Sequence, residues 1–227
     1  MLLELSRPII RTSLVDMVYE NLLESIVSGR LPSGSELNEV GLAEELQVSR
    51  TPVHEALRRL ATDGLVELLA TRRLRVARFD ESNLLEIYDL RKLLECAAVE
   101  RAAEHASDED LAKLRTEFKA LTAARKADDW TTRAIAFDVA FHLQIAELSG
   151  NRQLGAEIAK YKRLVQVFCR ITGTAENLWD ACQEHGRILD ALRVHDPVAA
   201  RRAMKTHIEA RQHVVLRESQ NRQASRP

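Results

Sequence analysis

Four side chains in the second half of this 227-residue sequence have the types and spacing of a metal site. Asp138 and His142 are one helical turn apart, so both would project from the same helical face. His185 and His207 each lie on the apolar stripe of a later helical segment. One carboxylate and three imidazoles on the inward faces of three helices could converge on a single divalent ion, which is how helical bundles build metal sites.

The same residues also allow a purely structural interpretation. A histidine that faces a protein core is more often hydrogen-bonded to its neighbours than bound to a metal, and spacing alone supports both interpretations about equally. The remaining histidines lack this context, and we expect surface positions or polar contacts for them: His54, His105, His195 and His213.

The candidate ligands fall within a run of six amphipathic segments that follows Asp80. The breaks between segments hold turn and cap residues, such as Gly150-Asn151 and Asp196-Pro197. We therefore predict an all-α six-helix bundle over residues 80–219 and a disordered polar tail over residues 220–227. The six expected helices cover residues 81–106, 108–126, 130–149, 151–172, 175–194 and 196–218.

The composition agrees with a mostly α-helical protein. Aromatic residues make up 4% of the chain, charged residues 30%, and glycine and proline number 8 and 5. Cys96, Cys169 and Cys182 are far apart and form no CxxC pair, so we expect reduced core residues. No segment resembles a signal peptide or a membrane span, which predicts a cytoplasmic protein with no membrane partner.

The stretch LAEELQVSRTPVHEALRRLATDGLVE, from Leu42 to Glu67, predicts two short helices joined by a tight turn. Ser49 or Thr51 can cap the second helix, and Pro52 falls in its first turn, where the missing N–H costs nothing. This is the pattern of a helix-turn-helix unit, whose second helix can lie in a DNA major groove. An ordinary helical hairpin gives the same pattern.

Alternating residues after this stretch predict a small β-hairpin, Val66/Leu68 pairing with Leu74/Val76. The formal net charge of the chain is only −1, so DNA binding would depend on local charge. Four arginines near the hairpin lie within seven residues, with no acidic residue among them: Arg72, Arg73, Arg75 and Arg78. We therefore predict a winged helix-turn-helix domain over residues 1–79, with modest affinity per subunit and a requirement for a homodimer.

The segment GRLPSGSELNEVGLAEELQVSRTPVHEALRRLATDGLVE resembles the DNA-binding domain of the GntR family of bacterial transcription regulators. The resemblance implies a palindromic operator with GT and AC in its half-sites. It also implies DNA contacts at the start of the second helix and in the wing, which here are Ser49, Arg50, Thr51, His54, Arg72, Arg73 and Arg75. Members of the family usually carry arginine where this chain has His54 and glycine where it has Arg73.

The later motifs RKLLECAAVERAAEHA, DVAFH…LSGN and EHGRILDAL resemble the FCD effector domain of the FadR-type branch, in its six-helix, VanR-like group. The resemblance implies a divalent ion, zinc with nickel or manganese as alternatives, held by Asp138, His142, His185 and His207. An open coordination position would accept a small carboxylate effector. Arg91 matches a pocket arginine of the family, although an intrahelical pair with Glu95 would also explain it.

Two functions from different classes fit these features. The first is a DNA-binding transcriptional regulator, most simply a repressor, whose operator binding is controlled by a small organic acid at the metal. The alternative is a metal-dependent hydrolase or lyase, because an open coordination position could activate water. No obvious general base accompanies the candidate ligands, and the first 80 residues would have no role in such an enzyme. We therefore expect a regulator and not an enzyme.

Overall fold

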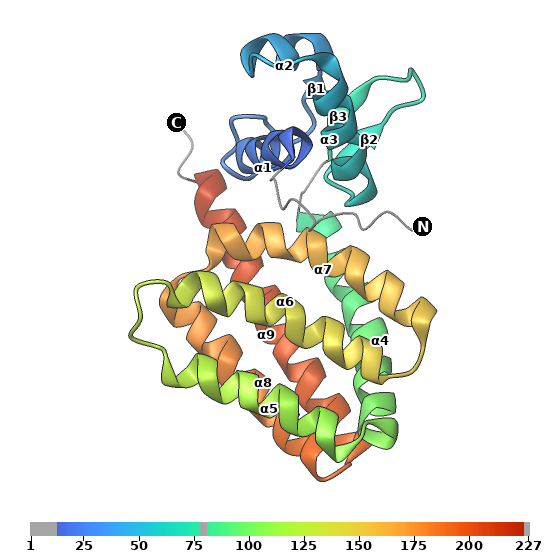
Figure 1. Cartoon of the computed structure of the whole chain (residues 1–227), viewed down its shortest axis with the longest axis vertical. Helices are drawn as coiled ribbons and strands as arrows, with labels where there is room; N and C mark the ends of the chain where they lie inside the picture. The colour runs from blue at the N-terminus through green and yellow to red at the C-terminus, as the bar shows by residue number, and fades with distance from the viewer. Residues whose placement is uncertain (1–12, 78–80, 225–227) are drawn as a thin grey trace, which may run out of the picture. The chain divides into compact units, whose positions relative to one another are not determined.

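The computed structural model describes residues 13–77 and 81–224, which belong to two compact units, the first ending at Ala77. The first unit combines three helices with a small sheet, and the second contains helices only (Figure 1). The predicted fold class, a winged helix-turn-helix followed by a six-helix bundle, is therefore confirmed.

The three helices of the first unit are α1 (Leu14–Val27), α2 (Glu39–Glu45) and α3 (Arg50–Thr62). Helix α1 begins with a capping box in which Ser13 and Asp16 satisfy each other's backbone N–H groups. Helix α3 has Ser49 as its N-cap and Pro52 in its first turn, as the sequence predicts. Its inward face is formed by side chains of at most 1% exposure: Val53, Ala56, Leu57 and Leu60.

Two left-handed residues set the path of the chain around the helix-turn-helix. Gln47, in the turn between α2 and α3, has a φ of 54°. Gly64 has a φ of 77°, which glycine adopts without steric cost, and it turns the chain out of α3 into the sheet.

The wing is a three-stranded antiparallel sheet of order β1-β3-β2, formed by β1 (Glu36–Leu37), β2 (Val66–Leu68) and β3 (Leu74–Val76). The predicted hairpin is present, with Val66 opposite Val76. The prediction of two strands was incomplete, because β1 adds Glu36 opposite Arg75. A strand of two residues has no alternation of its own and shows no signal in the sequence.

The second unit consists of α4 (Glu81–His105), α5 (Asp108–Ala123), α6 (Trp130–Leu148), α7 (Arg152–Thr172), α8 (Ala175–Arg193) and α9 (Pro197–Ala224). Each helix lies within the expected segment to a few residues, except at the end of α9. That helix continues to Ala224, so the prediction of a disordered tail from residue 220 was wrong as far as residue 224. Residues 219–224 contain neither glycine nor proline, which explains the continuation.

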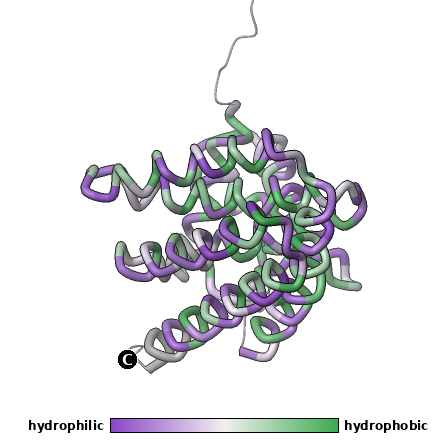
Figure 2. Tube along the Cα trace, turned by 90° about the horizontal axis from the view of Figure 1, so that it is seen from below, coloured by the Kyte–Doolittle hydropathy of each residue, from purple (hydrophilic) through white to green (hydrophobic). Residues whose placement is uncertain are grey.

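The bundle core lies between α4, α6, α8 and α9. Helix α9 packs along α4 and α8, while α6 packs against α7 and α4. Hydrophobic and hydrophilic residues alternate along the helices, as an amphipathic bundle requires (Figure 2). Phe141, Ile188 and Met204 are completely buried. Within residues 13–77 and 81–224, no helix has both the length and the apolar character needed to cross a membrane.

Two of the three cysteines are confirmed as buried free thiols, namely Cys96 and Cys182. Burial raises the pKa of the Cys182 thiol to about 12. A thiol in this environment stays protonated at neutral pH and packs as a small apolar side chain. The side chain of Cys169 lies outside the described part of the structure.

Candidate functional site

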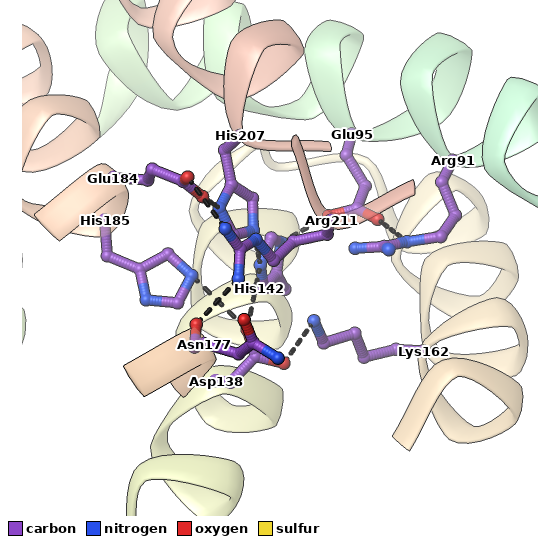
Figure 3. A network of polar contacts seen from close by, with 10 residues as sticks. All are labelled: Arg91, Glu95, Asp138, His142, Lys162, Asn177, Glu184, His185, His207 and Arg211. Atoms are coloured by element: carbon purple, nitrogen blue, oxygen red, sulfur yellow. Dashed lines mark hydrogen bonds and ion pairs between the residues drawn. The ribbon is translucent and has the colours of Figure 1, made fainter. Parts of the chain in front are cut away.

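The four candidate ligands meet inside the bundle. Asp138 and His142 come from α6, His185 from α8 and His207 from α9. One ligand atom from each residue lies within 4.8 Å of the ligand atoms of the other three, and all four residues are buried. Figure 3 shows the three imidazoles and the carboxylate gathered around one point. Side chains separated by up to 69 positions in the chain are thus brought together at one centre.

Three of the distances between these atoms are close to those expected around a single transition-metal ion. His142 Nε2 lies 3.2 Å from His207 Nε2, and Asp138 Oδ1 lies 3.4 Å from His185 Nε2 and 3.7 Å from His142 Nε2. Metal–ligand bonds of about 2.1 Å place neighbouring ligands roughly 3 to 3.5 Å apart. The donor set of three imidazole nitrogens and one carboxylate oxygen has the chemistry that suits zinc or a similar ion.

The protonation states also suit coordination. Burial lowers the pKa of His142 to about 4 and lowers the pKa values of His185 and His207. Burial alone would raise the pKa of Asp138, but Lys162 and the neighbouring imidazoles hold it well below its usual value. At neutral pH the cluster therefore offers neutral imidazoles and an ionised carboxylate, which are the forms that bind metal ions.

Carboxylates outside the cluster orient two of the imidazoles. Glu95 contacts Nδ1 of His142, and Glu184 Oε2 lies 2.8 Å from Nδ1 of His207. Each contact occupies one ring nitrogen and directs the other, Nε2, toward the centre of the cluster. Arg211 holds the second oxygen of Glu184 at 3.0 Å. Carboxylate–histidine pairs of this kind accompany metal-bound histidines in many proteins.

The sequence interpretation missed Lys162 and assigned no part of the site to Glu184. Lys162, on α7, is only 2% exposed, and its Nζ lies 2.7 Å from Asp138 Oδ2. A signal was present, because Lys162 lies on the same helical stripe as the buried Ile158 and Val165. A lysine on an inward apolar stripe needs a buried partner, although the sequence does not say which one.

Among the described residues, Arg91 uses only one of its guanidinium nitrogens for a hydrogen bond. Its Nε donates to Glu95 Oε1 at 2.7 Å, so the expected intrahelical pair forms. The residue is 1% exposed, and its Nη1 and Nη2 have no hydrogen-bond partner among the described residues. Burying guanidinium donors without hydrogen-bond partners costs free energy. Two such donors can bind one carboxylate through two parallel hydrogen bonds.

A pocket adjoins the cluster on the side of Arg91. Its empty volume, including the open mouth, is about 480 Å³. The polar lining includes Arg91, Lys162 and Arg211 as well as Asp138 and His207, and much of the remaining wall is aliphatic. A small molecule in this pocket would therefore meet the candidate metal position and three cationic side chains at once.

Four of the residues predicted to contact DNA lie at the start of α3. Ser49, Arg50, Thr51 and His54 are all exposed, and the Ser49 side chain makes no capping hydrogen bond. Glu39, at the start of α2, lies 2.9 Å from His54 Nδ1 and 3.9 Å from an Arg50 nitrogen. These side chains therefore form an exposed polar group on the helix that the motif directs at base edges.

Two of the arginines on the wing form ion pairs that the sequence did not indicate. Arg73 pairs with Glu36 at 3.0 Å, and Arg75 pairs with Glu67 at 2.6 Å. Arg72 is exposed, has a φ of 59°, and makes no ion pair with any described residue. Arg78 lies outside the described residues. Local positive charge is therefore present on the wing but partly neutralised by acids from β1 and β2.

The four histidines that were not assigned to the cluster are all exposed, as expected: His54, His105, His195 and His213. His195 makes polar contacts with the Ala103 carbonyl at 2.8 Å and with Asp108 at 3.1 Å. Its φ of 50° closes the turn between α8 and α9.

Comparison with known proteins identifies both units. Residues 3–76 match the family of bacterial regulatory proteins named gntR, and residues 86–210 match the FCD domain. The chain is 32% identical over 227 aligned positions to the HTH-type transcriptional repressor NanR of Escherichia coli, covering 90% of this chain and 85% of NanR. It is 30% identical to the "Probable D-xylose utilization operon transcriptional repressor" of Paenarthrobacter nicotinovorans, covering 90% of both chains. The E. coli McbR/YncC structure matches with a TM-score of 0.69 at 25% identity, covering 92% of this chain and 100% of that one.

Proposed function

This chain belongs to the GntR family of bacterial regulatory proteins and carries an FCD domain, and we propose that it is a repressor controlled by a small organic acid. The acid would bind beside a divalent ion held by Asp138, His142, His185 and His207. The family and the relatives are transcription regulators, not enzymes, so the hydrolase or lyase alternative is set aside.

The DNA-binding part of the proposal rests on the exposed start of α3 and on the wing. Arg50, Thr51 and His54 would reach base edges in the major groove, while the hydroxyl of Ser49 would meet a phosphate. Arg72, Arg73 and Arg75 would contact the backbone or the minor groove. Because each unit offers few free positive charges, a homodimer on a palindromic operator would supply the affinity.

The observation that carries the regulatory part is the convergence of four buried ligand residues next to unpartnered guanidinium nitrogens. A divalent ion at this point supplies Lewis acidity and an open position for an anionic ligand. The nitrogen-rich donor set favours zinc, with nickel or manganese as alternatives. Arg91 would hold the effector through Nη1 and Nη2, while Glu95 fixes its Nε.

Regulation requires that the effector bind one conformation of the dimer more tightly than another. The residues around the pocket come from α4, α6, α7, α8 and α9, so a ligand that draws them together would change how these helices pack. Helix α4 follows the DNA-binding unit directly in the chain, and we expect the change in packing to be transmitted through it.

Native mass spectrometry of the purified full-length chain, combined with footprinting on DNA upstream of its own gene, tests the proposal. We expect a dimer that carries one divalent ion per subunit, and a protected palindromic site whose occupancy changes when an organic acid is added. A protein that neither contains nor takes up metal would refute the metal assignment. Absence of a protected site under every condition would refute the regulatory role.

A further inference from the structure

We propose that the effector carries two separate carboxylate groups, and that Lys162 acts together with Arg91 to select for the second one. The inference rests on the proposed function, because it takes the metal site and the effector pocket as given. It goes further by assigning the charge of the ligand and a recognition residue that belongs neither to the four ligands nor to Arg91.

The first argument is charge balance in the described surroundings of the cluster. Three cationic side chains, Arg91, Lys162 and Arg211, face three carboxylates, Glu95, Asp138 and Glu184. Their charges cancel, and metal-bound imidazoles are neutral. Of these six side chains, the most exposed is Arg211 at 15%. Addition of a divalent ion leaves two positive charges in a largely buried site, where uncompensated charge is strongly unfavourable. A ligand with two negative charges restores neutrality.

The second argument is the supply of hydrogen-bond donors. Among the described residues, three buried guanidinium nitrogens have no hydrogen-bond partner: Nη1 and Nη2 of Arg91 and Nε of Arg211. One carboxylate at an open metal position would leave the Arg91 donors unmatched unless the ligand had a second acceptor group. A second carboxylate fits the fork of a guanidinium through two parallel hydrogen bonds.

The third argument concerns the position of Lys162. Its ammonium group contacts Oδ2 of Asp138, while Oδ1 of the same carboxylate faces His142 and His185. An ion bound by the histidines would take Oδ1, so Lys162 can keep its contact with Oδ2. An ammonium group has three donors, and Lys162 lines the pocket together with Arg91. It therefore has donors left for a ligand beside its contact with Asp138, which Figure 3 shows.

The lining of the pocket limits the rest of the ligand. The aliphatic wall includes Ile135, Val165 and Val215, which suits a hydrocarbon chain between two acid groups. We therefore expect an aliphatic dicarboxylate.

Calorimetry with the zinc-loaded full-length protein tests the inference. The probes are malonate, succinate, glutarate and adipate, each compared with its own monoamide, which has nearly the same shape and one charge less. We expect at least one of these diacids to bind about tenfold or more tightly than its monoamide. The inference is overturned if every monoamide binds as tightly as its diacid, or if none of the four diacids binds. Orthophosphate that binds as tightly as the best diacid would also overturn it, because one dianionic group would then suffice.

The variant Lys162→Met tests the assigned residue, with Lys160→Met as the matched control on the exposed face of the same helix. In Lys162→Met we expect the affinity for the preferred diacid to fall about tenfold, while the affinity for its monoamide changes by less than about twofold. Lys160→Met should leave both unchanged. Equal effects of the two variants on diacid affinity would refute the role of Lys162. If Lys162→Met does not fold, the affinities of the wild-type protein for each diacid and its monoamide still decide the charge of the ligand.

The outcomes also separate this inference from the proposed function. A monocarboxylate that binds the zinc-loaded protein as tightly as the diacids would leave the metal-dependent effector site intact and refute only the requirement for two charges. A wild-type protein that takes up no metal, measured by mass spectrometry before any acid is added, would refute the metal assignment of the proposed function.

Discussion

The carboxylate of Glu184 lies 2.8 Å from Nδ1 of His207, so one residue on α8 orients a candidate ligand on α9. Arg211 binds the other carboxylate oxygen at 3.0 Å and fixes the orientation of Glu184 in turn. This contact leaves Nε2 of His207 directed at the cluster, 3.2 Å from the corresponding atom of His142. The site thus depends on residues that would not themselves touch the ion.

Substitution Glu184→Gln should weaken metal binding without removing a ligand. An amide orients and polarises the imidazole less strongly than a carboxylate, and loss of such a partner typically costs 10- to 100-fold in metal affinity. Competition for zinc against a chromophoric chelator measures the change. Glu176→Gln, an exposed position on the same helix, is the control and should retain the wild-type affinity. An unchanged affinity in Glu184→Gln would contradict the assigned role.

Metal removal should lower the thermal stability of the wild-type protein. An ion that binds only the folded state stabilises it by about 2.7 kcal/mol when its free concentration is 100 times its dissociation constant. We therefore expect chelation to lower the melting temperature of the wild type and of His213→Ala, whose histidine is exposed on α9. The melting temperature of His207→Ala should not respond to chelation, and calorimetric melting curves test this. A full response in His207→Ala would mean that the stabilising ion binds elsewhere.

Substitution Arg50→Ala should weaken binding to the operator by about 1–3 kcal/mol, because one base contact would be lost. Fluorescence anisotropy with operator and random DNA at a fixed salt concentration measures the effect. Arg58→Ala makes the same charge change at an exposed position further along α3. It should affect the two DNAs equally or not at all. If Arg50→Ala weakened both DNAs equally, Arg50 would contact phosphate alone.

The contact of His195 with Asp108 should make part of the stability depend on pH. The hydrogen bond to Asp108, and then the one to the Ala103 carbonyl, raise the pKa of His195 above its ordinary value of 6.5. A raised folded-state pKa stabilises the fold below pH 6.5, and this contribution disappears as the pH rises through the folded-state value. His195→Asn keeps a residue that tolerates a φ of 50° but cannot be protonated.

The free energy of unfolding should therefore differ more between wild type and His195→Asn at pH 5.5 than at pH 8.5. Urea unfolding at the two pH values measures the difference, and His213→Asn serves as the exposed control. A difference that is the same at both pH values would show that His195 contributes only through the geometry of its turn.

Much of the helical part of the fold could be predicted from sequence, because periodicity and end signals are local. The start of α3 is an example, since Ser49 at the N-cap and Pro52 in the first turn depend on residues within a few positions. The bundle helices were located in the same way. The end of α9 was placed too early because a polar helical segment without a stop signal looks like a tail.

Contacts between distant residues could not be predicted in this way. The spacing of Lys162 from Ile158 and Val165 could have indicated an inward position, but its contact with Asp138 depends on how α7 packs against α6. The pairing of Arg73 with Glu36 depends on strand β1, whose two residues carry no periodic signal. The residue types of the cluster were visible in the sequence, whereas the groups that orient it required the folded structure.

The two oxygens of Asp138 have different partners, and this difference affects which ion the proposed site would bind. With Oδ2 held by Lys162, only Oδ1 faces the histidines, so the carboxylate is set to bind through a single oxygen. Calcium requires six to eight oxygen ligands and often takes carboxylates through both oxygens, and magnesium also prefers oxygen and keeps much of its water. One oxygen among three nitrogens satisfies neither ion. We therefore expect the proposed site to bind calcium and magnesium weakly compared with zinc.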